Sequence, residues 1–195
     1  MTSDMSEQVT ERLAGLGRAL DAAQRARSED PSPGQIRARA DAFVASAVQH
    51  LTTVTSVLLP EAARLPDSKQ SVRDVLDTVK ALERALVVVK ARVYGQAQNA
   101  QRPWDYVWGD ARDCLAEFAT SELALVTFLD NSLDSGGLDR VQTAMSRAVA
   151  SPTRPHPYLP HLGLSGRMAR RLCVTIDRIW DELEGRVTSS GSPAP

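Results

Sequence analysis

The sequence predicts an all-α protein, an up-down-up-down four-helix bundle with a C-terminal helical extension. Apolar residues recur at spacings of three and four, and no segment alternates apolar with polar residues. Proline- and glycine-rich breaks separate four amphipathic stretches of about twenty residues or more. Long amphipathic helices joined by short breaks pack most economically side by side in alternating directions.

The first two predicted helices carry clear apolar stripes. In the first, the stripe residues are spaced by four, three and four: Val9, Leu13, Leu16 and Leu20. A break at residues 28–34 precedes the second helix, over about 35–64, where Pro60 is expected to kink or stop it. The stripe of the second helix is Phe43/Val44, Ala47, Leu51, Val54 and Leu58.

The next two predicted helices follow breaks at Pro66–Asp67 and before Pro103. The third, over about 68–98, has the stripe Val72, Leu76, Val79, Leu86 and Val93, with Glu83 and Lys90 at its edge. The fourth has the stripe Trp104, Val107/Trp108, Ala111, Leu115, Phe118, Glu122, Leu125/Val126 and Leu129. Trp104 and Trp108 share a face and should close one end of the core. Residues 130–137 are expected to end this helix.

The remainder is predicted to form an extension of the same domain. A shorter helix carries Leu138, Val141, Met145 and Val149, and a final helix is expected over 165–187. Between them, residues 151–163 contain four prolines and should form an extended strap. We therefore expect a single domain at 1–187, with a core bundle at 7–133 and an extension at 138–187. The polar tail at 188–195 is expected to be disordered.

Composition excludes several classes of protein. The chain has 195 residues, 43% of them hydrophobic, and a net charge of −1, which excludes a globally basic nucleic-acid binder. The N-terminus has acids where a signal peptide needs basic residues, and no stretch approaches a membrane span, so a cytoplasmic protein is expected. Cys114 and Cys173 are far apart and are expected to be small buried apolar groups. Glycine-rich nucleotide loops and hydrolase motifs are absent from the sequence.

Glu122 and His50 are the candidate metal ligands. Glu122 lies on a core-facing stripe, where a carboxylate must be hydrogen-bonded, paired, metal-bound or protonated. A pair with an arginine, or a stripe edge that reaches solvent, is the alternative. His50 flanks the second stripe and could bind a metal ion through a neutral nitrogen, or could simply be a hydrogen-bonded, partly buried side chain. A metal needs three or four ligands, and the further candidates are Asp41, Glu61 and Glu83.

Two C-terminal features have both a functional and a structural explanation. His156 and His161 could share a ligand site, but four prolines favour a stiff strap that docks Tyr158 and Leu159 on the bundle. The arginines Arg154, Arg167, Arg170 and Arg171 form a positive segment that could attract phosphates or an acidic partner. Acidic residues follow directly, so a solvated face is favoured and nucleic-acid binding is not expected.

Four stretches resemble actinobacterial proteins of the hemerythrin-like (HHE cation-binding) family. They are DAFVASAVQHLTTVTSVLLPEAARLPD (41–67), RVYGQAQNAQRPW (92–104), LAEFATSELALV (115–126) and RPHPYLPHLG…ARRL…IDRIWDELEGR (154–186). The resemblance implies a four-helix bundle whose core holds non-haem iron, ligated by histidines and carboxylates in HxxxE and HxxxH patterns.

The sequence departs from that ligand pattern. Phe118 stands where the HxxxE histidine belongs, Glu122 is kept, and the fourth residue after His50 is Val54, not an acid. The family's di-iron site uses about five histidines and two carboxylates, whereas this chain has three histidines in all. The resemblance therefore implies a largely lost di-iron site in a non-enzymatic protein that binds a protein or small ligand, with no cofactor. The alternative is an iron or zinc protein with a reduced site at His50 and Glu122.

Overall fold

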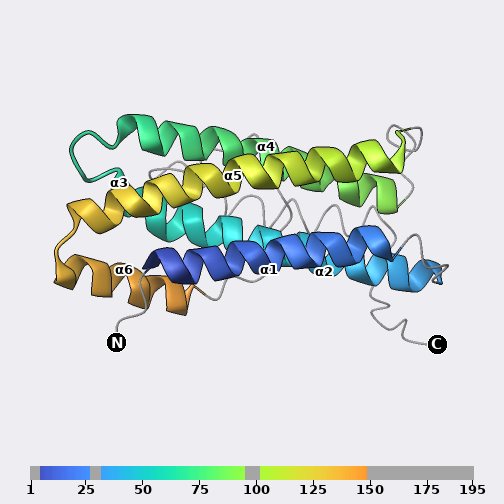
Figure 1. Ribbon diagram of the computed structural model, residues 1–195, viewed down its shortest axis with the longest axis horizontal. Coiled ribbons are helices and arrows are strands. Elements are labelled where there is room, and N and C mark those ends of the chain that lie inside the picture. Colours follow the sequence, from blue (N-terminus) through green and yellow to red (C-terminus); the bar gives the residue numbers. More distant parts are fainter. Residues whose placement is uncertain (1–4, 27–31, 95–101, 149–195) are drawn as a thin grey trace, which may run out of the picture. The chain divides into compact units, whose positions relative to one another are not determined.

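The helices of this protein pack as long, roughly aligned rods (Figure 1). The computed structural model describes residues 5–26, 32–94 and 102–148, all within one unit of the chain, Met1–Tyr158. In chain order, the elements are α1 (Met5–Arg25), α2 (Pro33–Thr53), the π-helical turn η1 (Val54–Leu58), α3 (Leu59–Ala62), α4 (Lys69–Val93), α5 (Trp104–Ser132) and α6 (Ser135–Arg147). The described ranges contain no strand, which confirms the all-α prediction for them.

The contacts between helices define their order around the core. Both α1 and α4 contact α2 and α5. Helices α4 and α5 run antiparallel, because Thr78 bonds to Ser121 near one end while Arg92 stacks on Trp104 near the other. Helices α2 and α5 run in the same direction. Phe43 meets Trp108, and further along both helices His50 meets Glu122.

The core consists of the apolar stripes of these helices. All four predicted stripe residues of α1 are buried, as are the predicted stripe residues of α2 and η1. On α4 the prediction was one position out of phase in places. Val75 and Leu82 are fully buried, whereas Leu76 and Val93 are only half-buried. Glu83 was predicted at the stripe edge. It is buried, with 8% exposure, because the buried face of α4 includes its position.

The helix that begins as α2 continues through Pro60 by means of the π turn η1. Proline has no N–H, so the carbonyl four residues earlier loses its α-helical partner. In η1 the chain instead makes a wider turn, and the Leu59 N–H donates to the Val54 carbonyl five residues back. Hydroxyls at four neighbouring positions also donate to carbonyls of the preceding turn: Thr52, Thr53, Thr55 and Ser56. The helix therefore does not stop at Pro60, because a π turn precedes the proline and α3 continues to Ala62.

The breaks between helices differ in position and length from those that the sequence indicated. Helix α2 begins at Pro33, because Ser32 and Gln35 form a reciprocal capping box. The break after α3 includes Asp67, whose φ of 60° is left-handed. Only Leu133 and Asp134 separate α5 from α6, since Asp134 caps α6 through the Gly137 N–H at 2.7 Å.

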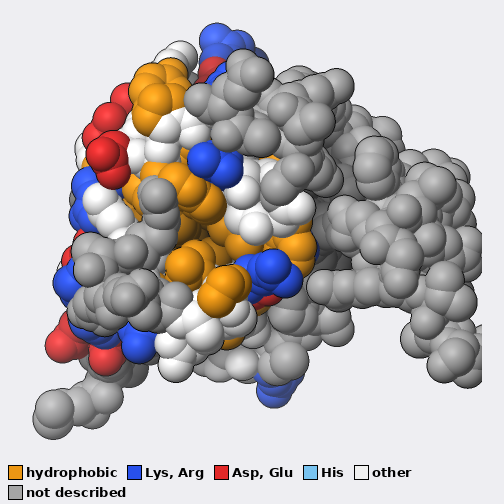
Figure 2. Space-filling view, turned by 90° about the vertical axis from the view of Figure 1, so that its right-hand side faces the viewer, with side chains coloured by type: hydrophobic (Ala, Val, Ile, Leu, Met, Phe, Trp, Pro, Cys, Tyr) orange, Lys and Arg blue, Asp and Glu red, His pale blue; other side chains and the backbone are white. Residues whose placement is uncertain are grey.

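Aromatic residues close the core where α5 begins. Trp104 and Trp108 are stacked with centroids 6.1 Å apart, as predicted, and Phe43 packs on Trp108 at 6.3 Å. Figure 2 views the molecule from this end of α5, and hydrophobic side chains gather there among lysine and arginine side chains. The large hydrophobic side chains exposed in the described part of the chain are Val87, Tyr94 and Tyr106.

One described stretch, Pro33–Ala62, is long and apolar enough by length and composition to cross a membrane, with a mean hydropathy of 1.4. The sequence analysis overlooked it. Its apolar window is 61% buried against the rest of the molecule, as expected for a helix at the centre of a helical core.

Several predictions concern residues outside the described ranges. These are Val149, the strap with His156 and His161, the arginine segment 154–171, Cys173, the final helix at 165–187 and the tail at 188–195. Cys114 is described, and it is half-buried on α5 rather than fully buried as expected.

Candidate functional site

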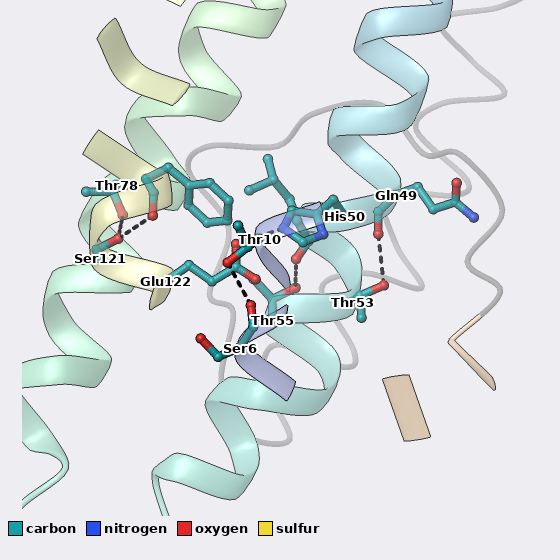
Figure 3. Close-up of polar contacts among 11 residues, drawn as sticks. Ser6, Thr10, Gln49, His50, Thr53, Thr55, Thr78, Ser121 and Glu122 are labelled. Carbon is teal, nitrogen blue, oxygen red and sulfur yellow. Dashed lines mark hydrogen bonds and ion pairs between the residues drawn. The ribbon is translucent and has the colours of Figure 1, made fainter. Parts of the chain in front are cut away.

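His50 and Glu122 meet in the core, so the two predicted ligand residues are brought together. The Nε2 atom of His50 lies 2.8 Å from Oε2 of Glu122, and the side chains are 5% and 0% exposed. Figure 3 shows Glu122 reaching from α5 toward His50 on α2. The alternatives for Glu122, a pair with arginine or an edge that reaches solvent, are therefore wrong.

Local structure explains why these side chains point inward. Glu122 lies one turn after Phe118 on an uninterrupted α5, so both follow the same apolar stripe. The Phe118 ring meets the His50 ring edge-on, with centroids 5.8 Å apart and an angle of 85°. His50 lies in the last turn of α2, directly before η1. Phe118 thus packs directly against the imidazole of His50.

The hydrogen bonding between His50 and Glu122 uses one polar atom of each side chain and leaves the other without a partner in the described structure. With Glu122 ionised, Nε2 of His50 carries a hydrogen and donates it to Oε2. The other two polar atoms, Nδ1 of His50 and Oε1 of Glu122, are buried without a hydrogen-bond partner in the described structure. A buried polar atom left unpaired costs about 1–3 kcal/mol, so each is a place where a ligand could gain a hydrogen bond.

The other predicted ligands do not join this pair. Asp41 accepts a hydrogen bond from the Tyr94 hydroxyl at 2.5 Å, and Glu61 pairs with Arg64 at 2.5 Å on the surface. Glu83 is buried, but in the described residues no group of three or more His, Cys, Asp or Glu side chains could hold a metal ion. The described residues therefore do not fit the di-iron centre that the resemblance implies.

Polar contacts near the site connect the helices. The hydroxyls of Thr78 on α4 and Ser121 on α5 lie 2.7 Å apart, next to Glu122 along the chain (Figure 3). On the surface, Arg112 of α5 donates to Asp21 of α1 at 2.7 Å and to Gln24 at 2.8 Å. These contacts hold α5 against α4 and α1, and so they fix the position of the helix that carries Glu122.

The sequence analysis missed the π turn that follows His50. Two signals could have indicated it: the hydroxyl-rich run of residues 52–56 and a proline inside a continuing apolar stripe. Single π turns inside α-helices are frequently found at functional sites. Its position, four residues after His50, adds to the reasons for regarding the His50–Glu122 pair as the functional candidate.

Comparisons with protein-family models, curated proteins and solved structures gave no match to this chain. The functional argument therefore depends on the geometry of the His50–Glu122 pair and its surroundings.

Proposed function

We propose that the protein is a metal-independent, non-enzymatic binding protein of the hemerythrin-like class. In this proposal α1, α2 with η1 and α3, α4 and α5 form the up-down-up-down four-helix bundle, and the chain after Leu133 is its extension. The antiparallel contact of α4 with α5 and the common direction of α2 and α5 support that arrangement. The bundle keeps its shape without iron, because its core is largely apolar.

The direct bond between His50 and Glu122 carries this proposal. At 2.8 Å the Nε2 atom of the imidazole and the Oε2 atom of the carboxylate satisfy one another, and the Phe118 ring packs against the imidazole. A histidine and a glutamate that bond to each other have no need of a metal ion to compensate for their burial. The pair then serves as a buried polar contact that joins α2 to α5.

Elemental analysis of anaerobically purified protein tests the proposal. We expect far less than one iron or zinc per chain, and no change in Tm on addition of a chelator. About one tightly bound metal per chain, lost in Glu122→Gln but retained in the matched surface variant Glu61→Gln, would overturn it. Because Gln keeps the shape of the side chain, circular dichroism of both variants can verify that the helices remain folded.

A reduced metal site is the second candidate function. The unpartnered Nδ1 of His50 and Oε1 of Glu122 favour it, because both atoms can donate electron pairs to iron or zinc. Anaerobic titration of the metal-free protein with Fe²⁺ or Zn²⁺ tests it. Saturable binding at one equivalent that is abolished by His50→Gln supports this candidate, and its absence removes it.

The same proposal locates the protein in the cytoplasm. Burial of most of the apolar window in Pro33–Ala62 supports this, because a helix that uses its apolar side for the core is not free to face lipid. Fractionation of cells that express the full chain should place it in the soluble fraction. Recovery in the membrane fraction that resists washing with high salt would contradict this location.

A further inference from the structure

A pocket lies beside the buried His50–Glu122 pair, and the hydrogen bond within that pair gives the pocket no role. It has a volume of about 450 Å³ and lies where α1, α2 and the end of α6 come together. Its lining includes Arg12, Gly15, Ser46, Gln49, His50 and Ser146. Pockets of roughly 300–1,000 Å³ are the size that small ligands occupy in proteins.

The lining of this pocket includes a polar side chain without a full set of partners. His50 is 6% exposed, its Nε2 is committed to Glu122, and its Nδ1 has no hydrogen-bond partner among the described residues. Buried polar atoms in folded proteins are nearly always hydrogen-bonded, so an orphaned one on a residue that lines a pocket needs an explanation. A ligand that bonds to Nδ1 would supply the missing partner.

The charge of the lining indicates what kind of ligand fits. Among the described residues, Arg12 is on the lining and no aspartate or glutamate is, while Ser46 and Gln49 add neutral hydrogen-bond donors. Two lining hydroxyls are already used, since Thr53 donates to the Gln49 carbonyl and Ser146 to the Gln142 carbonyl. An electropositive, donor-rich pocket suits a ligand that only accepts hydrogen bonds.

We propose that this pocket binds a small oxyanion, a carboxylate or phosphate group, between the Arg12 guanidinium and the Nδ1–H of His50. The carboxylate of Glu122 accepts from Nε2–H and the ligand accepts from Nδ1–H, so the ligand completes the hydrogen bonding of the imidazole. A metal ion is disfavoured here, because Arg12 repels cations and no second His, Cys, Asp or Glu of the described ranges lines the pocket. The inference rests on the proposed function, since it supplies the small ligand of a binding protein.

Imidazole NMR of the full-length chain tests the site directly. The chain has three histidines, so His156→Gln with His161→Gln leaves His50 as the only imidazole. Titration of this variant with inorganic phosphate, and separately with acetate, at constant ionic strength should shift the Nδ1 resonance saturably. Saturation by one anion and not the other identifies the group that binds. A shift that never saturates with either anion would overturn the proposal.

Two matched glycine variants locate the binding. A Cβ atom added at Gly15 would meet only the end of Arg18, at 3.8 Å, and one added at Gly17 would meet nothing within 4 Å. Gly15→Leu should therefore fill the pocket and abolish anion binding. Gly17→Leu puts the same side chain on the same helix outside the lining and should leave the affinity within about twofold. Binding that survives Gly15→Leu would contradict the assignment.

Removal of the guanidinium tests the charge argument. Arg12→Gln should weaken the saturating anion about tenfold, the size expected for one charge-assisted hydrogen bond. An unchanged affinity in this variant would overturn the proposed role of Arg12. The outcomes also separate the two proposals. One metal per chain overturns the proposed function, whereas metal-free protein that binds neither anion overturns only the pocket assignment.

Discussion

The contacts of α2 with α5 include two that use opposite chemistry. Near the start of α5, Phe43 packs on Trp108, which stacks on Trp104. Further along the same two helices, His50 bonds to Glu122. The aromatic contact tolerates many apolar replacements, because burial of apolar area has no preferred direction. The polar contact requires both partners, because loss of either leaves a buried charged or polar group alone.

The largest expected effect is from breaking the polar contact. His50→Leu keeps the volume but leaves the Glu122 carboxylate buried without its partner, so we expect a loss of about 3–5 kcal/mol in the free energy of unfolding. Urea denaturation at pH 7 measures it. The control is the double variant His50→Leu/Glu122→Leu, which removes both polar groups and should recover most of the loss. A double variant as unstable as the single one would show that packing, not polarity, sets the cost.

A comparable substitution in the aromatic contact should lower the free energy of unfolding by less. Trp108→Phe retains a ring against Phe43 and Trp104 and removes only part of the buried indole. Because the Nε1 of Trp108 is buried without a hydrogen-bond partner, no bond is lost with it. We expect a loss of about 1–2 kcal/mol from the smaller side chain, measured by the same denaturation. A loss equal to that of His50→Leu would remove the distinction between the two contacts.

Loss of the surface ion pair between α5 and α1 should lower the free energy of unfolding least. Arg112 and Asp21 are 47% and 39% exposed, so water screens their attraction. Arg112→Gln should cost less than about 1 kcal/mol and depend on salt. Denaturation at low and high salt measures both. A loss of free energy of unfolding larger than that of Trp108→Phe would mean that surface contacts, more than the core, hold α5 in place.

A kinetic effect is expected at Cys114, which lies between the two contacts along α5. Burial raises the pKa of this thiol above its ordinary value, and the nearby carboxylates of Asp110, Glu117 and Asp113 raise it further, while Arg84 opposes them. A raised pKa leaves less thiolate at neutral pH, so alkylation should be slower than that of a free cysteine and should accelerate with rising pH.

The alkylation rate can be measured with iodoacetamide in a Cys173→Ser background, which leaves one thiol. Asp110→Asn removes one of the charges that raise the pKa and should speed the reaction at pH 7.5. A rate at that pH equal to that of a free cysteine would contradict the expected direction.

The sequence was informative about which face of each helix is buried. The four-residue spacing of Phe118 and Glu122 placed both in the core, because that spacing returns to the same face of an α-helix. The partner of Glu122 could not be read in the same way. His50 is 72 residues away along the chain, and its approach depends on how α2 and α5 pack.

The errors came from small shifts in phase along single helices. An error of one residue rotates the predicted face by about 100°, and this is why Leu76 was predicted where Val75 is buried and why Glu83 was placed at an edge. The pocket beside His50 was beyond sequence reasoning for another reason. It depends on α1, α2 and α6 converging, and no periodicity within one helix contains that information.

The π turn η1 also determines how the chain could be shortened. It places one more residue in a turn than an α-helix would hold, and both the residues before it and those after it, such as Leu51 and Leu59, are buried. Deletion of one residue within 54–58 would allow regular helix and keep the downstream residues in phase, because the wide turn absorbs one residue. Leu59 and Ala62 would then stay in the core. The π turn therefore lets the chain carry an extra residue while two halves of one long helix face the same interior.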